Sequence, residues 1–232
     1  MATHVITGAG SGIGAEVARR LLERGDTLYL LARNAGRAKE LSEEFEGAHT
    51  LVGDLGEPER LSWAFGHQTL PGDVDSLLHV AGVVELGGVG ETTPKTWNAT
   101  LAANLVGPAE LTRLLLPQLR QAAGHVVFVN SGAGLATNPQ WSAYSASKHG
   151  LKALADALRG EEAGNGIRVT SVYPGRTATP MQEKVHRQEG KSADEYAAGR
   201  FIPVGAVATT VLTALDLPRG AEVTDLSVRP GG

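Results

Sequence analysis

A tyrosine and a lysine stand four positions apart in a segment with helical periodicity, residues 141–162. About 40° around the helix axis separates Tyr144 from Lys148, so their side chains share one face and meet one turn apart. Such a pair alone is usually a surface contact. Ser131 makes it more specific, because this hydroxyl follows an apolar strand-like run at 125–129, at the sheet edge where ligands bind.

These residue types suit the reduction of a ketone, which needs a hydride at carbon and a proton at oxygen. A free tyrosine has a pKa of about 10, about three units too high for efficient exchange near neutrality, equivalent to roughly 4 kcal/mol. An ammonium at about 4 Å, with an effective dielectric of about 20, supplies roughly that amount, while burial works against it. We therefore expect Tyr144 to act as acid/base, Lys148 to lower its pKa, and Ser131 to bond the carbonyl oxygen.

A glycine-rich turn near the N-terminus joins an apolar run at 4–7 to an amphipathic helical pattern that ends at Gly25. Helix N-termini present unpaired N–H groups, and glycines let a diphosphate approach the backbone closely. The predicted ligand is a dinucleotide, although an ordinary tight turn would have a similar pattern. The residues expected to bind it are Gly8, Gly10, Ser11, Gly12, Ile13 and Gly14.

A second apolar run, at 27–32, closes a strand–helix–strand unit typical of a mononucleotide-binding half. At the end of this strand an acid favours a free ribose 2′-hydroxyl, and a base favours a 2′-phosphate. Ala32 stands where the acid is expected, and Arg33 follows it. Since a guanidinium can bind a phosphate in a fork, we expect NADP(H) to be preferred, with NAD(H) possible. A merely solvated Arg33 is the alternative.

Two further strand ends contribute to the expected adenosine site. The run at 48–52 is followed by Asp54 and Leu55, where the carboxylate could accept a bond from the base or cap the helix after Pro58. The run at 75–81 ends in Ala81 and Gly82, whose small size lets the backbone approach the nucleoside.

The whole pattern predicts an α/β fold, a Rossmann-type doubly wound and mostly parallel sheet of seven strands with helices on both faces. Strands at 125–129, 167–173 and 222–228 complete the sheet, and helices are expected at 35–46, 94–121, 141–162 and 204–217. The helix 94–121 should bend around Gly107 and Pro108. We expect residues 1–232 to form one domain, with the polar, weakly periodic segment 176–203 as a mobile lid over the substrate.

Composition narrows the class of protein. A chain of 232 residues can bury one sizeable core, and a net charge of −4 without a long basic run argues against nucleic acid. The absence of cysteine excludes disulfides and thiolate metal sites, and no carboxylate and histidine cluster has metal-ligand spacing. No export or membrane-spanning pattern occurs, so we expect a cytoplasmic protein without membrane partners.

Taken together, the motifs resemble the short-chain dehydrogenase/reductase family over nearly the whole chain. Residues 7–14 look like its Thr-Gly-x-x-x-Gly-x-Gly turn, and the offset of 13 from Ser131 to Tyr144 is typical of it. The resemblance implies that Lys148 also binds the ribose hydroxyls and that Asn104, polar within an apolar helix, holds a water linked to Lys148. A bond from the buried amide to nearby backbone is the alternative for Asn104. It also implies a homodimer or homotetramer, and a nicotinamide end held by Pro174, Gly175, Thr177 and Thr179.

Two departures from the family pattern stand out. Residues 79–82 read His-Val-Ala-Gly where Asn-Asn-Ala-Gly is usual, which removes the asparagines that brace the sheet, and the segment after Thr179 is short. The predicted function is an NADP(H)-dependent oxidoreductase acting on a small carbonyl or alcohol. The alternatives are a catalytically silent NADP(H)-sensing regulator, which would not need the three polar residues together, and an epimerase or dehydratase of the same superfamily.

Several other side chains have competing interpretations. His149 points about 100° away from Lys148 and is interpreted as structural or surface. His79 is expected at a strand end against the sheet, and His186 as a solvated loop residue rather than a substrate contact. The apolar groups expected to face the substrate, with core packing as the alternative, are Val83, Leu135 and Trp141.

Overall fold

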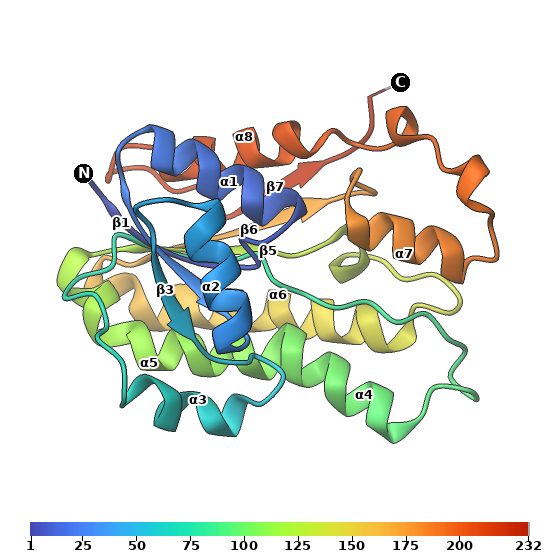
Figure 1. The fold of residues 1–232 in the computed structure, drawn as a ribbon, viewed down its shortest axis with the longest axis horizontal. Coiled ribbons are helices and arrows are strands. Elements are labelled where there is room, and N and C mark those ends of the chain that lie inside the picture. Colours follow the sequence, from blue (N-terminus) through green and yellow to red (C-terminus); the bar gives the residue numbers. More distant parts are fainter. Residues whose placement is uncertain (232) are drawn as a thin grey trace.

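One parallel sheet organises the fold, described for residues 1–231 in a computed structural model (Figure 1). The strand order is β3-β2-β1-β4-β5-β6-β7, and each neighbouring pair is parallel, which confirms the predicted sheet. The order reverses between β1 and β4, and such a switch point leaves a crevice at the carboxyl ends of the strands. The strands are β1 (Thr3–Thr7), β2 (Thr27–Ala32), β3 (His49–Val52), β4 (Ser76–His79), β5 (His125–Val129), β6 (Arg168–Pro174) and β7 (Asp225–Val228).

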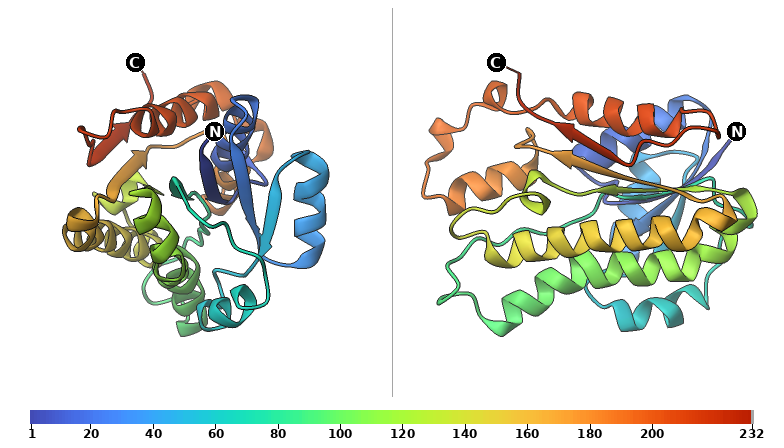
Figure 2. Two further views of the ribbon diagram at one scale, coloured as in Figure 1. Left: turned by 90° about the vertical axis from the view of Figure 1, so that its left-hand side faces the viewer. Right: turned by 180° about the vertical axis from the view of Figure 1, so that it is seen from behind.

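Helices cover both faces of the sheet, as the views in Figure 2 show. On one face lie α1 (Gly12–Glu23), α2 (Ala35–Glu44) and α8 (Val204–Leu215); on the other lie α3 (Pro58–Phe65), α4 (Pro94–Leu101), α5 (Gly107–Ala122) and α6 (Ser142–Glu162). Side chains alternate along a strand, so Ile6 packs with Val17 of α1 in one core, while Val5 packs with Leu111 of α5 in the other. Both β1 residues are fully buried, which is typical of a central parallel strand.

A π-helical turn, Ala102–Val106, joins α4 to α5 within the long helical segment that the sequence predicts. The irregularity therefore lies just before Gly107 and Pro108, not around them. Gly107 lies against the loop after β3, where a Cβ would fall 2.3 Å from the carbonyl oxygen of Leu55. A π turn inserts an extra residue into a helix, and here it contains Asn104.

Two strands are shorter than predicted because polar side chains accept hydrogen bonds from backbone amides that would otherwise bond to a neighbouring strand. β4 ends at His79 rather than at Ala81, since the amides of Val80 and Ala81 both donate to Thr7 Oγ1 at 3.0 Å. β7 begins at Asp225 rather than at Glu222, whose carboxylate accepts the amide hydrogen of Val169 at 2.6 Å.

The segment 176–203 contains a helix that the sequence analysis missed, α7 (Pro180–Gln188), followed by the short turns Ala193–Glu195 and Ala198–Arg200. Thr179 caps the helix by accepting the amide hydrogen of Gln182 at 3.2 Å, and Pro180 occupies its first turn. Its buried positions follow helical spacing, but two of them, Gln182 and His186, are polar and hide the periodicity. The motion of this segment stays a prediction.

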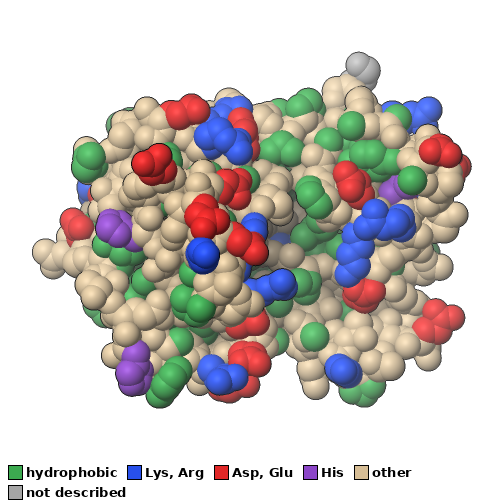
Figure 3. All heavy atoms as spheres, in the orientation of Figure 1, with side chains coloured by type: hydrophobic (Ala, Val, Ile, Leu, Met, Phe, Trp, Pro, Cys, Tyr) green, Lys and Arg blue, Asp and Glu red, His purple; other side chains and the backbone are tan. Residues whose placement is uncertain are grey.

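Positive and negative side chains alternate over the face seen in Figure 3, and the surface is hollowed between the α1–α2 side and the α7 side. Within residues 1–231, no helix combines the length and the apolar character needed to span a membrane.

Candidate active site

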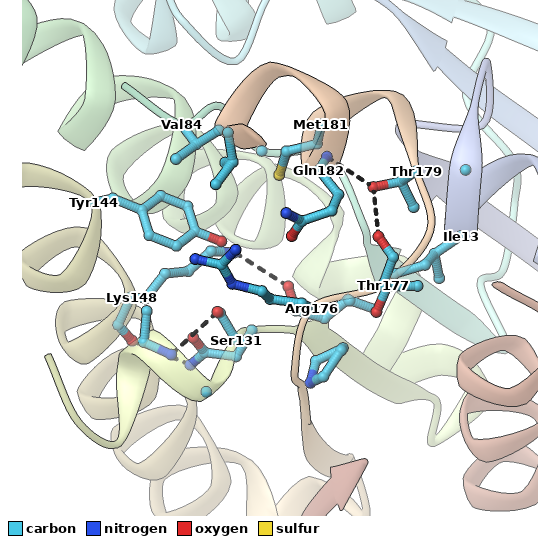
Figure 4. A pocket seen from close by; sticks show the side chains of 18 of the residues that line it. Ile13, Val84, Ser131, Tyr144, Lys148, Arg176, Thr177, Thr179, Met181 and Gln182 are labelled. Atoms are coloured by element: carbon cyan, nitrogen blue, oxygen red, sulfur yellow. Dashed lines mark hydrogen bonds between the residues drawn. The ribbon is translucent and has the colours of Figure 1, made fainter. Parts of the chain in front are cut away.

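A cavity of about 460 Å³ opens at the carboxyl edge of the sheet (Figure 4). Its walls come from the glycine-rich turn, the ends of β4, β5 and β6, the start of α6, and α7. Most of the sequence-predicted site residues line it: Gly8, Ser11, Gly12, Ile13, Gly14, Ala81, Gly82, Ser131, Tyr144, Lys148, Pro174, Gly175, Thr177 and Thr179.

The other predicted site residues, Gly10, Arg33, Asp54, Leu55 and Asn104, are outside the cavity wall. Arg33 is exposed just after β2. The Asp54 carboxylate accepts the amide hydrogen of Gly56 at 2.8 Å, and Glu57 occupies the N-cap position of α3, so the cap interpretation of Asp54 is wrong. A contact between Asp54 and a base stays a prediction.

The glycine-rich turn fits a diphosphate. A Cβ on Gly14 would fall 2.2 Å from the carbonyl oxygen of Gly8, and Gly8 itself has φ +74° and lies against the backbone of Ala81. Ser11 precedes α1 without capping it through its side chain, so the first N–H groups of the helix stay available for an anion. The close packing and the uncapped helix end are the features that a dinucleotide site requires.

Arg37, which the sequence analysis missed, covers this turn from the first turns of α2. Its Nη2 donates to the carbonyl oxygen of Gly10 at 2.8 Å, and its Nη1 pairs with Glu40. The arginine lies four residues after Arg33, at the start of the helix that follows β2, the strand whose end is expected to contact the ribose. That position was the signal that could have found it.

Tyr144 and Lys148 come from one face of α6, and Ser131 from the end of β5. The Lys148 ammonium lies 5.9 Å from the centre of the Tyr144 ring and donates to the carbonyl oxygen of Val129 at 3.2 Å. Both side chains are buried and line the cavity. The structure thus brings the three polar residues together, as their spacing predicts.

Burial dominates the electrostatics of this cluster. It raises the pKa of Tyr144, which the neighbouring Ser131 hydroxyl lowers, and it lowers the pKa of Lys148 to about 8. The expected net lowering of the tyrosine pKa is therefore not found in the protein alone. The reason is that desolvation penalises the charged form of both groups.

The side-chain amide of Asn104 forms hydrogen bonds with the backbone. Its Oδ1 accepts the amide hydrogen of Val83 at 2.8 Å, and its Nδ2 donates to the Val83 carbonyl oxygen at 2.8 Å and to Ser147 Oγ at 3.0 Å. The amide holds the loop after β4 against α6. The water that the family resemblance assigns to Asn104 stays a prediction.

The apolar wall differs partly from the expectation. Trp141 lines the cavity and meets the Tyr144 ring edge-on, with 5.7 Å between ring centres. Val83 and Leu135 are 45% and 46% exposed and outside the wall, so core packing is wrong for both, and their contact with a substrate stays a prediction. Because Asn104 fixes the backbone of Val83, the next residue, Val84, is buried and lines the cavity instead.

Arg176 and Gln182 also line the cavity and were missed by the sequence analysis. Arg176 directly follows the Pro-Gly pair at the end of β6, and Gln182 follows Thr179 by three residues on α7. Both residues lie close in sequence to residues that the family pattern identifies, and this proximity could have identified them.

The histidines have structural contacts. His79 stacks on Phe128 with 4.8 Å between ring centres, and burial lowers its pKa to about 3. His149 Nδ1 lies 2.9 Å from the carbonyl oxygen of Ser145. His186 is buried on α7 with Nε2 3.0 Å from the carbonyl oxygen of Ser192, so its interpretation as a solvated loop residue is wrong. In the part of the chain that the structure describes, no group of three or more histidines and carboxylates could hold a metal.

The reversed sheet order, the glycine cradle and the buried tyrosine–lysine pair define a Rossmann-type oxidoreductase with a nicotinamide cofactor. Comparison with known proteins agrees: the family model described as short chain dehydrogenase matches residues 2–190. The chain belongs to the short-chain dehydrogenase/reductase family.

The chain is similar to several different oxidoreductases. It is 35% identical to dehydrogenase/reductase SDR family member 7B of Bos taurus, over 92% of this chain and 70% of that protein. It is 33% identical to a glycine betaine reductase of Emericella nidulans, over 97% of this chain but only 18% of that longer protein. A short-chain dehydrogenase from Sphingobium yanoikuyae, solved in complex with NADPH, has a TM-score of 0.80 and 27% identity, covering 99% and 88% of the two chains.

Proposed function

We propose that this protein is an NADP(H)-dependent oxidoreductase that transfers a hydride between the nicotinamide and a small carbonyl or alcohol substrate. One observation carries the proposal: Ser131, Tyr144 and Lys148 converge, from two elements, on a cavity that also contains the glycine-rich turn. A protein that only sensed the cofactor would have no need of this cluster.

The cofactor would be held along the cavity. Gly8, Gly12 and Gly14 and the uncapped start of α1 would bind the diphosphate. The exposed Arg33 and the guanidinium of Arg37 would bind a 2′-phosphate, which supports NADP(H) over NAD(H). The NADPH in the Sphingobium relative supports the same choice.

The chemistry of the side chains follows from their positions. When bound, the reduced nicotinamide supplies a hydride to the carbonyl carbon. The Tyr144 hydroxyl donates its proton to the carbonyl oxygen while Ser131 donates a hydrogen bond to that oxygen, and in alcohol oxidation the phenolate takes the proton back. Lys148 has three N–H donors, of which Val129 takes one, so two remain for the ribose hydroxyls.

The proposed oligomeric state and cellular location follow the expectations of the sequence analysis. We propose a single domain that functions as a cytoplasmic homodimer or homotetramer on small-molecule substrates. Size-exclusion chromatography with light scattering measures the assembly directly, and a monomer at assay concentrations would contradict that part of the proposal.

The test is hydride transfer, followed by NADPH absorbance with a panel of ketones and NADP⁺ with the matching alcohols. Tyr144→Phe should leave NADPH binding nearly intact and reduce kcat by about 10²- to 10⁴-fold, the range of a lost general acid. Turnover in the variant equal to that of the wild type would refute the role of Tyr144. Turnover with NADH better than with NADPH would refute the cofactor preference.

A further inference from the structure

The cavity wall has an uneven charge. Among the described residues that line it, the charged side chains are Lys148 and Arg176, and no carboxylate lines it. Lys148 is buried beside Tyr144 and bonded to backbone. Arg176 is different, because its side chain is 39% exposed and extends into the cavity from the loop after β6 (Figure 4).

Arg176 lies close to the position of the reacting group. Its guanidinium carbon is 5.9 Å from the centre of the Trp141 ring, and that ring is 5.7 Å from the ring of Tyr144. The cation and the proposed proton donor thus both lie beside the Trp141 ring. A substrate whose carbonyl lies at the Tyr144 hydroxyl would place a neighbouring substituent within reach of Arg176.

The charge of Arg176 is only partly neutralised. Its two terminal nitrogens pair with the Glu189 carboxylate, and that same carboxylate accepts a bond from Lys191 at 2.9 Å. Both cations hold the pKa of Glu189 well below its usual range, at about 2, so it stays ionised. Within this trio two cations share one anion, which leaves one net positive charge, and Lys191 also interacts electrostatically with the Glu195 carboxylate. The Nε–H of Arg176 has no protein partner within residues 1–231.

A second donor faces the same space. Gln182 is 94% buried, since its relative exposure is 6%, yet its Nε2 makes no hydrogen bond within the described chain. In Figure 4 its amide points from α7 into the cavity, toward the side where Arg176 lies. An unpartnered buried amide costs free energy, and an acceptor on the ligand would remove that cost.

We propose that the substrate carries a carboxylate beside its carbonyl or hydroxyl group, bound by the guanidinium of Arg176 and the amide of Gln182. This inference rests on the proposed function and names the substrate class of that site. A monoanion matches the single net positive charge, whereas a phosphate dianion would be repelled more strongly by Glu189. The planar fork of a guanidinium also matches a carboxylate.

The test compares small 3-oxo acids with their methyl esters, which have the same carbon skeleton without the charge. The wild type should have a kcat/KM for the acid at least about tenfold above that for the ester. Arg176→Met should lower the value for the acid by about 10- to 100-fold, mainly through KM, and change the ester by less than about threefold.

Glu189→Gln is the control for a purely structural role of the Arg176 pair. It breaks the ion pair but leaves the guanidinium free, so acid KM should fall or stay unchanged. If Arg176 served only to hold α7, both variants would impair acid and ester alike. That result, or equal kcat/KM for acid and ester in the wild type, would overturn the inference.

A binding measurement separates this inference from the proposed function. Calorimetry with propionate, butyrate and benzoate, in the presence of NADP⁺, needs no turnover. Carboxylate binding that Arg176→Met abolishes, without reduction of any ketone, would support the anion site and refute the hydride transfer. Ketone reduction without Arg176-dependent carboxylate binding would support the hydride transfer and refute the anion site.

Discussion

Replacing Lys148 by methionine should shift the pH dependence of turnover to higher pH. In the proposed mechanism alcohol oxidation needs the Tyr144 phenolate, so its rate should rise as pH passes the tyrosine pKa. The ammonium lies 5.9 Å from the ring centre in a buried site. With this ring-centre distance taken as the charge separation and an effective dielectric of about 20, Coulomb's law gives about 3 kcal/mol, or about 2 pH units.

The sign follows from the charges. A positive charge beside the hydroxyl favours the phenolate, so the ammonium opposes the burial that raises the tyrosine pKa. Without the ammonium, only the Ser131 hydroxyl opposes burial, and the tyrosine pKa rises. The rising limb of oxidation and the falling limb of reduction should both move up by about 2 pH units.

The assay is kcat against pH in both directions at saturating cofactor, together with a spectroscopic titration of the phenolate against Tyr144→Phe. Lys152→Met is the matched control, since it removes the same charge one turn further along α6, where the lysine pairs with Asp156. The control should retain the wild-type midpoint. A midpoint in Lys148→Met within about 0.5 pH units of the wild type, with cofactor binding retained, would refute the electrostatic reasoning.

Two further predictions concern stability. Asn104→Ala removes the bonds to both backbone groups of Val83 and should lower the free energy of unfolding in urea by about 2–4 kcal/mol, whereas the exposed Asn98→Ala should not; a loss below about 1 kcal/mol would contradict the role. His79 is neutral when folded because burial lowers its pKa from 6.5 to about 3, so the unfolded state binds a proton first as pH falls below 6.5. Stability should then decrease by about 1.4 kcal/mol per pH unit down to pH 3 on account of this residue. His79→Gln should reduce that slope in acid titrations of stability and the exposed His67→Gln should not; an equal slope in the His79 variant and the wild type would count against the burial argument.

The sheet could be predicted because its strands are continuous apolar runs separated by turn-forming residues. The predicted strand bounds are wrong where a side chain, rather than the backbone of a neighbouring strand, bonds to a backbone amide. The Thr7 hydroxyl accepts the amide hydrogens of the two residues after His79, and the Glu222 carboxylate accepts that of Val169. Hydrophobic periodicity predicts neither bond. Helix α7 was missed for a related reason, since two of its buried positions are the polar Gln182 and His186.

The candidate site divides in a similar way. Tyr144, Lys148 and Ser131 could be placed together because helical spacing and parallel strand ends determine where they lie. Arg37 and Arg176 lie near residues that the sequence analysis identified, but their contacts with the carbonyl oxygen of Gly10 and the carboxylate of Glu189 join separate segments. Spacing along one element does not encode such contacts.

Cofactor and substrate recognition therefore depend on different kinds of information in this fold. The diphosphate site requires backbone close to backbone, as at Gly14, where a Cβ would lie 2.2 Å from a carbonyl oxygen, and only glycine satisfies that geometry. In the proposed site, substrate choice depends on a charge balance among side chains from the β6 loop and the turn after α7, where Arg176 and Lys191 share Glu189. Changing one of these three residues would alter the net charge at the cavity without disturbing the sheet. Relatives that keep the tyrosine and lysine but change this trio should therefore prefer substrates of a different charge, and kcat/KM ratios for acid and ester pairs measure that preference.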